Sequence, residues 1–253
     1  RLNSIHVNTK RVILVYNITI LQLYERRIAM KQMPDSFDGT LRKSMIKVPE
    51  VIRECSGIFV FGRRIKSLVF STDLAIIRNI NADAVFAVHP FTPQPLITQT
   101  IVAASGLPVF AGVGGGLTNG ERAVNLATNA EMLGVAGVVL NAPTKNSVVK
   151  KISDIVDVPV VVSVVNDDVD VEARIEAGTN IFNVSAAKET PRLVKMIRDK
   201  FPTVPIIATG GPTDETILET INAGANAITW TPPSCAQLFS EVMDAYRKGL
   251  PHP

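Results

Sequence analysis

The feature that most constrains the fold is an alternation of short apolar runs with helical segments, which begins at Lys66 and continues to the end of the chain. Such alternation predicts βα units whose strands pair in a parallel sheet. The apolar runs that we interpret as strands are residues 67–70, 84–88, 109–113, 137–140, 160–165, 181–184, 206–208 and 227–230.

A second pattern shows that these units come in pairs. Pro108, Pro159 and Pro205 precede three of the odd-numbered strands, at a position where a missing N–H costs no ladder hydrogen bond. A glycine precedes three of the even-numbered strands, where a helix C-cap needs a positive φ; these are Gly134, Gly178 and Gly224. The repeating unit is therefore βαβα, and four units predict a closed (β/α)8 TIM barrel over residues 66–253. A doubly wound open sheet is the alternative, but it does not require this regular pairing.

The chain before the barrel divides into two parts. Residues 1–30 form an N-terminal extension of uncertain status, and residues 31–65 are expected to cap one end of the barrel with a helix over 40–54 and a short strand over 58–61. The apolar stretch 12–24 is too short to span a bilayer as a helix. No small-residue cleavage site follows it, so we expect a cytoplasmic protein that does not contact a membrane.

Composition excludes several classes of protein. Hydrophobic residues make up 46% and charged residues 19%, which is typical of a globular protein and not of a disordered one. Two cysteines, Cys55 and Cys235, are too few for a disulfide framework or a cysteine metal cluster, and we predict no metal site. Lys and Arg exceed Asp and Glu by 13 to 5 in residues 1–66, but they are scattered and lack interleaved aromatic residues. We therefore expect a solvated surface and no nucleic-acid binding.

The end of the seventh strand, IIATGGP (206–212), places two glycines where a βα loop should begin. In barrels of this type the active site lies at the C-terminal ends of the strands, and the loops after strands seven and eight often hold a phosphate through backbone N–H groups. A tight turn that needs positive φ is the alternative explanation of the glycines. The predicted phosphate-binding residues are Thr209, Gly210, Gly211, Thr231 and Ser234.

Two motifs resemble known barrels. Thr209-Gly210-Gly211, followed by AGANAI (223–228), is similar to the last quarter of the ribulose-phosphate-binding barrels, which include ketodeoxyphosphogluconate aldolases, thiamine-phosphate synthases and barrels of the indole and histidine pathways. The resemblance implies a small phosphorylated ligand at strands seven and eight. This chain departs from it at Pro232 and Pro233, which remove two N–H donors from the loop after strand eight. Flavin-binding barrels hold the phosphate of FMN at a similar pair of glycines, so FMN stays open as a cofactor.

Residues 31–253 as a whole also resemble a bacterial family of TIM-barrel proteins that is sometimes labelled hydrolase. The segments that carry this resemblance are MPDSFDGTLRKSMI, GVGGGLTNGER, TGGPTDE and ITWTPP. It supports the barrel fold and implies no mechanism.

Four residues at or after strand ends are candidate catalytic groups. His89 is the one histidine of the barrel region before its C-terminus, and it is either a general acid or base or a hydrogen-bonded turn residue. Asp73 is either a base or metal ligand or the cap of the next helix. Lys145 could form a Schiff base if desolvated, and otherwise it is a surface or ligand-clamping lysine. Asn141 ends the fourth strand and completes the set.

Further ligand-binding candidates are Gly114, Gly115, Asn166 and Ser185. The run Gly114–Gly116 permits close approach of a ligand or a mobile lid, but it lacks the spacing of a dinucleotide fingerprint. Asn183, Val184 and Ser185 occupy the strand end where class I aldolases carry their lysine, which argues against Schiff-base chemistry. No Ser-His-Asp order, HExxH or Walker motif is present to support hydrolysis.

These features favour an enzyme that isomerises, or cleaves a carbon–carbon bond in, a small phosphorylated metabolite, with Asp73 or His89 transferring a proton. A divalent cation and a homo-oligomeric state stay open. The alternative from another class is a barrel that binds a sugar phosphate and regulates other molecules without catalysis.

Overall fold

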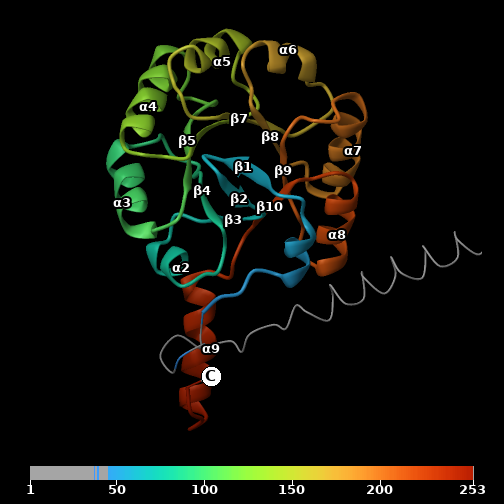
Figure 1. Cartoon of the computed structure of the whole chain (residues 1–253). Coiled ribbons are helices and arrows are strands. Elements are labelled where there is room, and N and C mark those ends of the chain that lie inside the picture. Colours follow the sequence, from blue (N-terminus) through green and yellow to red (C-terminus); the bar gives the residue numbers. More distant parts are fainter. Residues whose placement is uncertain (1–36, 38, 40–44, 253) are drawn as a thin grey trace, which may run out of the picture. The chain divides into compact units, whose positions relative to one another are not determined.

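The computed structural model describes residues 37, 39 and 45–252, so the expected extension 1–30 lies outside the described part. Eight parallel strands close into a barrel, in which the last strand pairs with the first (Figure 1). They are β3 (Ser67–Phe70), β4 (Ala84–Ala87), β5 (Val109–Gly114), β6 (Gly137–Leu140), β7 (Val160–Val164), β8 (Ile181–Val184), β9 (Ile206–Thr209) and β10 (Ala227–Trp230). The expected strands agree with these bounds to within one residue at each end. The closed (β/α)8 barrel is thereby confirmed against the open sheet.

Helices follow each strand and surround the barrel except at its last position (Figure 1). They are α2 (Leu74–Arg78), α3 (Pro95–Ser105), α4 (Gly120–Met132), α5 (Asn146–Ser153), α6 (Val171–Glu176), α7 (Thr190–Lys200), α8 (Asp214–Asn222) and α9 (Cys235–Arg247). The 3₁₀ helix η2 (Ala187–Glu189) precedes α7. Gly134, Gly178 and Gly224 have φ of 88°, 99° and 113° after α4, α6 and α8, as the repeat predicted. Among the described residues, no helix has the length and apolar character required to cross a bilayer.

The barrel interior is a packed layer of branched and aromatic side chains. One buried cluster gathers residues from all eight strands, among them Leu68, Phe86, Phe110 and Ile207. Phe110 packs directly on Gly137: a Cβ atom at position 137 would lie 2.7 Å from the Phe110 ring. The barrel is therefore filled, and a ligand site has to lie at one of its ends.

The segment before the barrel closes its N-terminal end. β1 (Ile58–Val60) and β2 (Arg63–Ile65) form an antiparallel hairpin, and Ile58, Val60 and Ile65 belong to the same buried cluster as the barrel interior. The turn residues Phe61 and Gly62 both have positive φ, which ends the first strand at Val60 and not at Phe61. The hairpin lies within residues 31–65, and the role of that whole segment as a cap stays a prediction.

The predicted helix over 40–54 is wrong where it can be compared. Residues 40–44 lie outside the described part, residues 45–49 are not helical, and only η1 (Glu50–Glu54) forms, as a 3₁₀ helix. Pro49 disfavours helical geometry at the residue before it, and Val48 instead donates its N–H to Asn81 Oδ1 at 2.8 Å. This segment packs on the outside of the barrel, where Ile46 forms a parallel bridge with Ile80 and η1 packs against α8.

Candidate functional site

The C-terminal mouth of the barrel carries a layer of neutral polar side chains. Ser163 and Asn183 pair across β7 and β8, and each lies two residues beyond an interior residue, so both face the barrel axis. Thr209 and Thr229 occupy the equivalent positions in β9 and β10. We call Ser163, Asn183, Thr209 and Thr229 the polar layer.

Hydrogen bonds join most of the polar layer. Asn183 Nδ2 donates to Ser163 Oγ at 3.1 Å, and Thr209 Oγ1 donates to Ser185 Oγ at 3.1 Å. Asn183 is only 6% exposed, yet its Oδ1 has no partner. A buried amide oxygen without a donor costs about 1–3 kcal/mol, so this atom marks a place for the hydroxyl of a ligand or for an ordered water.

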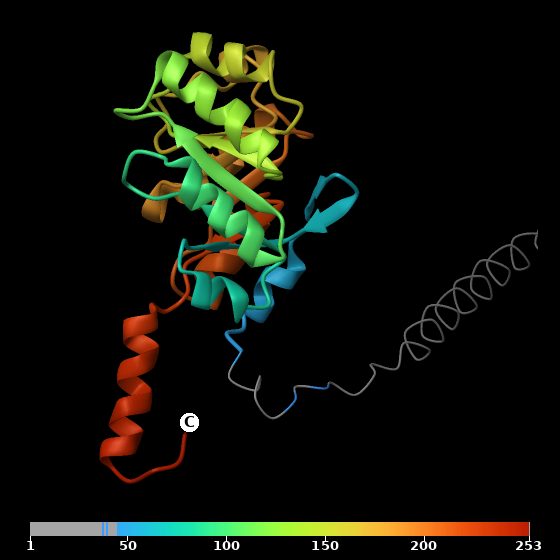
Figure 2. The same cartoon turned by 90° about the vertical axis from the view of Figure 1, so that its left-hand side faces the viewer.

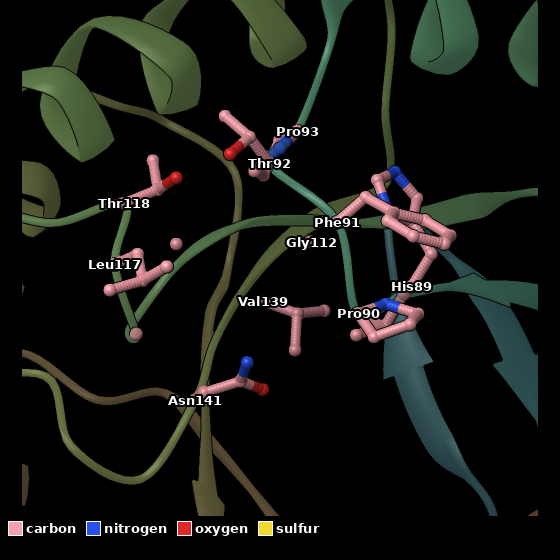
Figure 3. Close-up of a pocket in the computed structure, with 13 residues that line it drawn as sticks. His89, Pro90, Phe91, Thr92, Pro93, Gly112, Leu117, Thr118, Val139 and Asn141 are labelled. Atoms are coloured by element: carbon pink, nitrogen blue, oxygen red, sulfur yellow. The ribbon is translucent and has the colours of Figure 1, made fainter.

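A cavity of about 130 Å³ lies beside the polar layer, at the ends of β4, β5 and β6. Its walls include His89, Gly112, Val139 and Asn141, with Leu117 on the facing loop (Figure 3). Val139 lies on β6 and Asn141 directly follows that strand, and both residues line the cavity. The cavity is smaller than the roughly 300–1,000 Å³ of sites for drug-sized ligands and suits a small metabolite better than FMN.

His89 is the one titratable side chain that lines this cavity. It follows β4, which runs Ala84–Ala87, and its ring lies 6.1 Å from the ring of Phe91 (Figure 3). Its Nδ1 is buried without a partner. A turn histidine held by hydrogen bonds would use this atom, and the acid–base role of His89 stays a prediction.

The glycines after β5 have a packing explanation. Gly115 has φ of 109°, and a Cβ there would lie 2.5 Å from the Asn141 N atom and from Thr144 Oγ1. Its own N–H donates to the Thr118 carbonyl at 2.8 Å. Gly115 is thus required because the loop after β5 presses against the end of β6, while Gly114 and Gly116 line the cavity.

The paired glycines after β9 serve a tight turn. A Cβ at Gly210 would lie 2.8 Å from both Ile217 and Ile228, and Gly211 has φ of 83°. Thr213 and Thr216 cap each other at the start of α8, and the first turn of that helix carries two acidic residues. The helix N-terminus therefore has its own cap, and the negative charge beside it disfavours an anion there. A phosphate role for Thr209, Gly210 and Gly211 stays a prediction.

The other predicted phosphate residues belong to the connection between β10 and α9. Ser234 is the N-cap of α9, and its hydroxyl accepts the N–H of Gln237 at 3.3 Å. Thr231 is exposed at the end of β10. Both residues follow β10, which neighbours β9 in the barrel, as expected. Their role in ligand binding also stays a prediction.

Three further candidates do not line the cavity of His89. Asp73 caps α2 by accepting the N–H groups of Ala75 and Ile76 at 2.8 and 3.3 Å. The thiol of Cys235 lowers the pKa of Asp73, and these two N–H groups add to the effect against slight burial. Lys145 is an exposed residue at the start of α5. Asn166 is exposed and donates to Asp168 Oδ2 at 3.1 Å.

Sequence reasoning identified the strand ends but missed part of the polar layer. Ser163 and Thr229 lie inside runs that are otherwise apolar, so the sequence analysis assigned them to strands and not to a site. The signal that finds them is the period of two, since each lies two residues after an interior position. Among the described residues, no three His, Cys, Asp or Glu side chains come together in the manner of a metal site.

Comparisons of the sequence with protein-family models and with curated proteins found no match. Solved structures, in contrast, match across most of the chain. A phosphonopyruvate hydrolase in complex with oxalate and Mg²⁺ has a TM-score of 0.55 at 12% identity, covering 74% of this chain and 84% of its own.

Two other similar structures come from enzymes of different chemistry. The dihydrodipicolinate synthase of Bacillus anthracis has a TM-score of 0.52 at 16% identity, covering 72% of this chain and 75% of its own. A mandelate oxidase with an FMN adduct has a TM-score of 0.55 at 17% identity, covering 70% and 68%. The likeness concerns the fold. Because enzymes of three chemistries share this barrel, the reaction has to be argued from the site.

Proposed function

We propose that this protein is an enzyme that isomerises, or cleaves a carbon–carbon bond in, a small phosphorylated metabolite at the C-terminal mouth of the barrel. The observation that carries the proposal is His89, the one titratable group of the cavity, whose buried Nδ1 lacks a protein partner. A neutral imidazole can accept a proton and return it near neutral pH.

The surrounding groups supply what such a reaction needs. Removing a proton next to a carbonyl places negative charge on the carbonyl oxygen, and amide N–H groups that point at that oxygen stabilise it. Asn141 lines the cavity with His89, and the polar layer lies beside it. In this proposal His89 transfers the proton, Asn141 donates to the oxygen that gains charge, and the polar layer binds the hydroxyl groups of the substrate.

The phosphate of the substrate is assigned to the loops after β9 and β10. Thr209 contributes a half-buried hydroxyl next to the polar layer, and the backbone of Gly211 is exposed at the turn. Because the acidic first turn of α8 disfavours an anion at the helix end, the contacts proposed for the phosphate are the hydroxyl and N–H groups of these two loops, without help from the helix dipole. We therefore expect modest affinity that depends on the hydroxyl groups of the ligand as well as on its phosphate.

The first experiment is thermal denaturation of the protein with sugar phosphates, FMN and divalent cations. A ligand that binds only the folded state raises the melting midpoint by mass action. At a ligand concentration of 100 times the Kd it adds about 2.7 kcal/mol to the free energy of unfolding. A shift with a sugar phosphate, but not with the free sugar, names the substrate class. If no phosphorylated compound shifts the midpoint, the proposed substrate class is wrong.

A regulatory role without catalysis is the second candidate, and one observation favours it. The polar layer consists entirely of neutral side chains, and the carboxylate of Asp73 is engaged as a helix cap, so a ligand could bind without meeting a second acid–base group. Under this alternative a sugar phosphate stabilises the protein, no ligand of the panel is converted, and the His89→Gln variant binds as well as the parent protein.

A further inference from the structure

A second cavity of the mouth lies between the connections that follow β6 and β7. Its volume is about 320 Å³, and its lining includes Ala142 and Pro143 after β6 and Val165 and Asn166 after β7. These connections lead into α5 and α6, which are neighbours in the ring of helices, as Figures 1 and 2 show. Arg174 of α6 also lines this cavity, which we call the Arg174 cavity.

Arg174 is a half-buried cation whose charge no carboxylate of the described residues balances. Its Nη1 donates to the carbonyl of Thr144, and its Nη2 donates to the carbonyl of Ala142 at 2.8 Å. None of the ion pairs that the structure describes includes Arg174. Burial lowers the pKa of its guanidinium, and no neighbouring carboxylate counteracts this effect. Because buried charges are usually paired, an anion is expected beside this guanidinium.

The hydrogen bonds of Arg174 use only part of its guanidinium. An arginine has five N–H groups, and two of those of Arg174 donate to carbonyl groups, so three have no acceptor among the described residues. Arg198 of α7, which is also half-buried, differs in this respect, because all three of its nitrogen atoms donate. Their acceptors are the carbonyl groups of Pro202, Val204 and Gly224 and the Oδ1 atom of Asn226. The arginine with a structural role is thus saturated by the protein, whereas the arginine of the cavity is not.

Ser163 adds a second donor to the Arg174 cavity, and this one is almost fully buried. Ser163 is 7% exposed and lines the cavity. Its Oγ accepts the Nδ2–H of Asn183 at 3.1 Å, and its own O–H has no acceptor among the described residues. The buried Oδ1 of Asn183 also lacks a partner. The cavity therefore offers a cation and a hydroxyl donor to one ligand, with an unused acceptor next to the hydroxyl.

One carboxylate belongs to the lining and limits the charge of the ligand. Asp168 is exposed and accepts the Nδ2–H of Asn166 at 3.1 Å, and it forms no ion pair with Arg174. A single arginine with a carboxylate nearby matches one negative charge better than two. The charges thus favour a carboxylate over a phosphate group, which carries about −1.5 to −2 at neutral pH.

We propose that the Arg174 cavity binds the carboxylate group of a small ligand, which Arg174 and Ser163 hold by charge-assisted hydrogen bonds. A hydroxyl group next to that carboxylate donates to Asn183 Oδ1. The inference deepens the proposed function and rests on it for the link to the substrate, which then carries a carboxylate at β6 and β7 in addition to the phosphate assigned to β9 and β10. Binding of a carboxylate as such does not depend on catalysis.

The test follows the arginine Nε–H signals of the ¹⁵N-labelled full chain by NMR while glycolate is added. Glycolate is a small probe with one carboxylate and one hydroxyl group. Arg174→Lys and Arg198→Lys identify the two signals by their disappearance. We expect glycolate to move the Arg174 signal to saturation and to leave the Arg198 signal in place. Inorganic phosphate at the same ionic strength should move the Arg174 signal less.

Two variants measure the contacts of the bound carboxylate. Ser163→Ala should weaken glycolate binding about tenfold, because a hydrogen bond to a charged group is lost. The matched control is Arg192→Lys, at an exposed arginine that already pairs with Asp167 and Glu189. This variant should bind glycolate as tightly as the parent protein.

An Arg174 signal that glycolate does not move, or moves no more than the Arg198 signal, overturns the proposal. A larger response to phosphate than to glycolate overturns the assignment to a carboxylate, and unchanged affinity in Ser163→Ala overturns the contact with Ser163. The His89→Ala variant should bind glycolate like the parent protein, because His89 does not line this cavity. Loss of the proposed function, with no phosphorylated compound bound or converted, is therefore distinguishable from loss of this site.

Discussion

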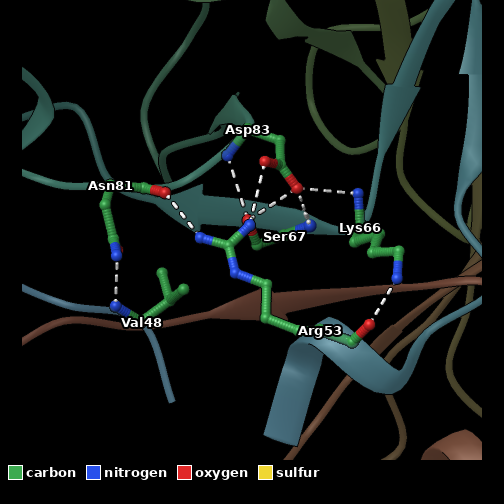
Figure 4. A network of polar contacts seen from close by, with 6 residues as sticks. All are labelled: Val48, Arg53, Lys66, Ser67, Asn81 and Asp83. Carbon is green, nitrogen blue, oxygen red and sulfur yellow. Dashed lines mark hydrogen bonds and ion pairs between the residues drawn. The ribbon is translucent and has the colours of Figure 1, made fainter. Parts of the chain in front are cut away.

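The cluster of hydrogen bonds around Asp83, at the N-terminal end of the barrel, and the mouth, at the C-terminal end, use polar side chains in opposite ways. At the N-terminal end Asp83 accepts the N–H groups of Lys66 and Ser67 and the hydroxyl of Ser67, each at 2.9 Å, and it pairs with Arg53 at 3.1 Å (Figure 4). Arg53 also donates to the carbonyl of Asn81. We call Arg53, Lys66, Ser67, Asn81 and Asp83 the Asp83 network. No side-chain atom of this network is buried without a partner.

At the mouth, in contrast, two buried polar atoms make no hydrogen bond within the protein. His89 Nδ1 and Asn183 Oδ1 are buried without partners. Ala187, which follows β8, has φ of 50°, a conformation that costs an alanine about 1–2 kcal/mol. Phe61, in the turn of the N-terminal hairpin, also has positive φ, so this strain does not distinguish the two ends.

The polar groups of the Asp83 network and those of the mouth differ in what they are available for. The Asp83 network ties η1, β3 and the start of β4 together, so its polar groups stabilise the barrel and its plug. The mouth keeps hydrogen-bonding capacity free at the strand ends where barrels of this type bind ligands. Substitutions at the two ends should therefore change different measured quantities.

The largest expected effect is on turnover at the mouth. Replacing His89 with Ala should lower kcat/KM by about 100- to 10,000-fold, since positioned proton transfer contributes that much. The urea midpoint should hardly move, because the side chain is half-buried and its Nδ1 makes no hydrogen bond. His252→Ala, at an exposed C-terminal position, is the matched control and should retain full activity. Unchanged turnover in His89→Ala would remove the catalytic assignment.

The next largest effect is on stability at the N-terminal end. Asp83→Ala should lower the free energy of unfolding by about 2–3 kcal/mol, because it leaves several donors unpaired in a partly buried network. Asp199→Ala breaks the exposed i,i+4 pair with Lys195 and should cost no more than about 0.5 kcal/mol. Urea unfolding of both variants measures the difference. Equal losses would contradict the structural role of the Asp83 network.

The same carboxylate predicts a pH dependence. Burial raises the pKa of Asp83, but the hydrogen bonds from Lys66 and Ser67 and the charge of Arg53 outweigh burial and hold the pKa below 3.8. A carboxylate with a lowered folded pKa stabilises fully above its unfolded value and loses that contribution as the pH falls through the folded value. The free energy of unfolding should therefore decrease as the pH falls below about 4. Asp83→Asn should show a smaller decrease over the same range.

A smaller effect distinguishes the two explanations of the paired glycines. Gly211→Ala should cost about 1–2 kcal/mol, because of the positive φ and a Cβ 2.6 Å from Thr216 Oγ1. Gly134→Ala is the matched control, with φ of 88° and open space at the Cβ position. If the turn alone needs glycine, both variants keep the thermal shift with sugar phosphates. Loss of that shift in Gly211→Ala only would support phosphate binding at this loop.

The smallest effect concerns Asp73. Removing its cap by Asp73→Ala should destabilise the protein by about 1 kcal/mol, which is the usual loss for an N-cap, and should leave turnover unchanged. Thermal denaturation and activity assays on one preparation measure both. A large loss of activity would return Asp73 to the list of catalytic residues, where the sequence alone had placed it.

Local signals in the sequence determined the elements of this fold. A proline before an odd strand marks the start of that strand, and a glycine before an even strand marks the end of the preceding helix. Both signals depend only on residues a few positions apart. That is why the strands and the closed barrel were predictable. The helix over 40–54 was a wrong prediction because the described part of this segment packs on the outside of the barrel, where Ile46 bridges to Ile80 and η1 contacts α8.

Only the tertiary structure decided which side chains are left without partners. Ser163, Asn183 and Thr229 come from three strands, and each lies two residues beyond a residue of the barrel interior, so closure of the barrel turns all three toward its axis. The same closure gave Asp73 a helix to cap and left His89 facing a cavity, although both residues follow strands in the sequence. The contacts of the segment 46–54 with Ile80 and α8 likewise join residues that are distant in the sequence. Hydrophobic periodicity is a short-range property of the chain, whereas the hydrogen-bond partners of a side chain depend on contacts between residues that are distant in the sequence.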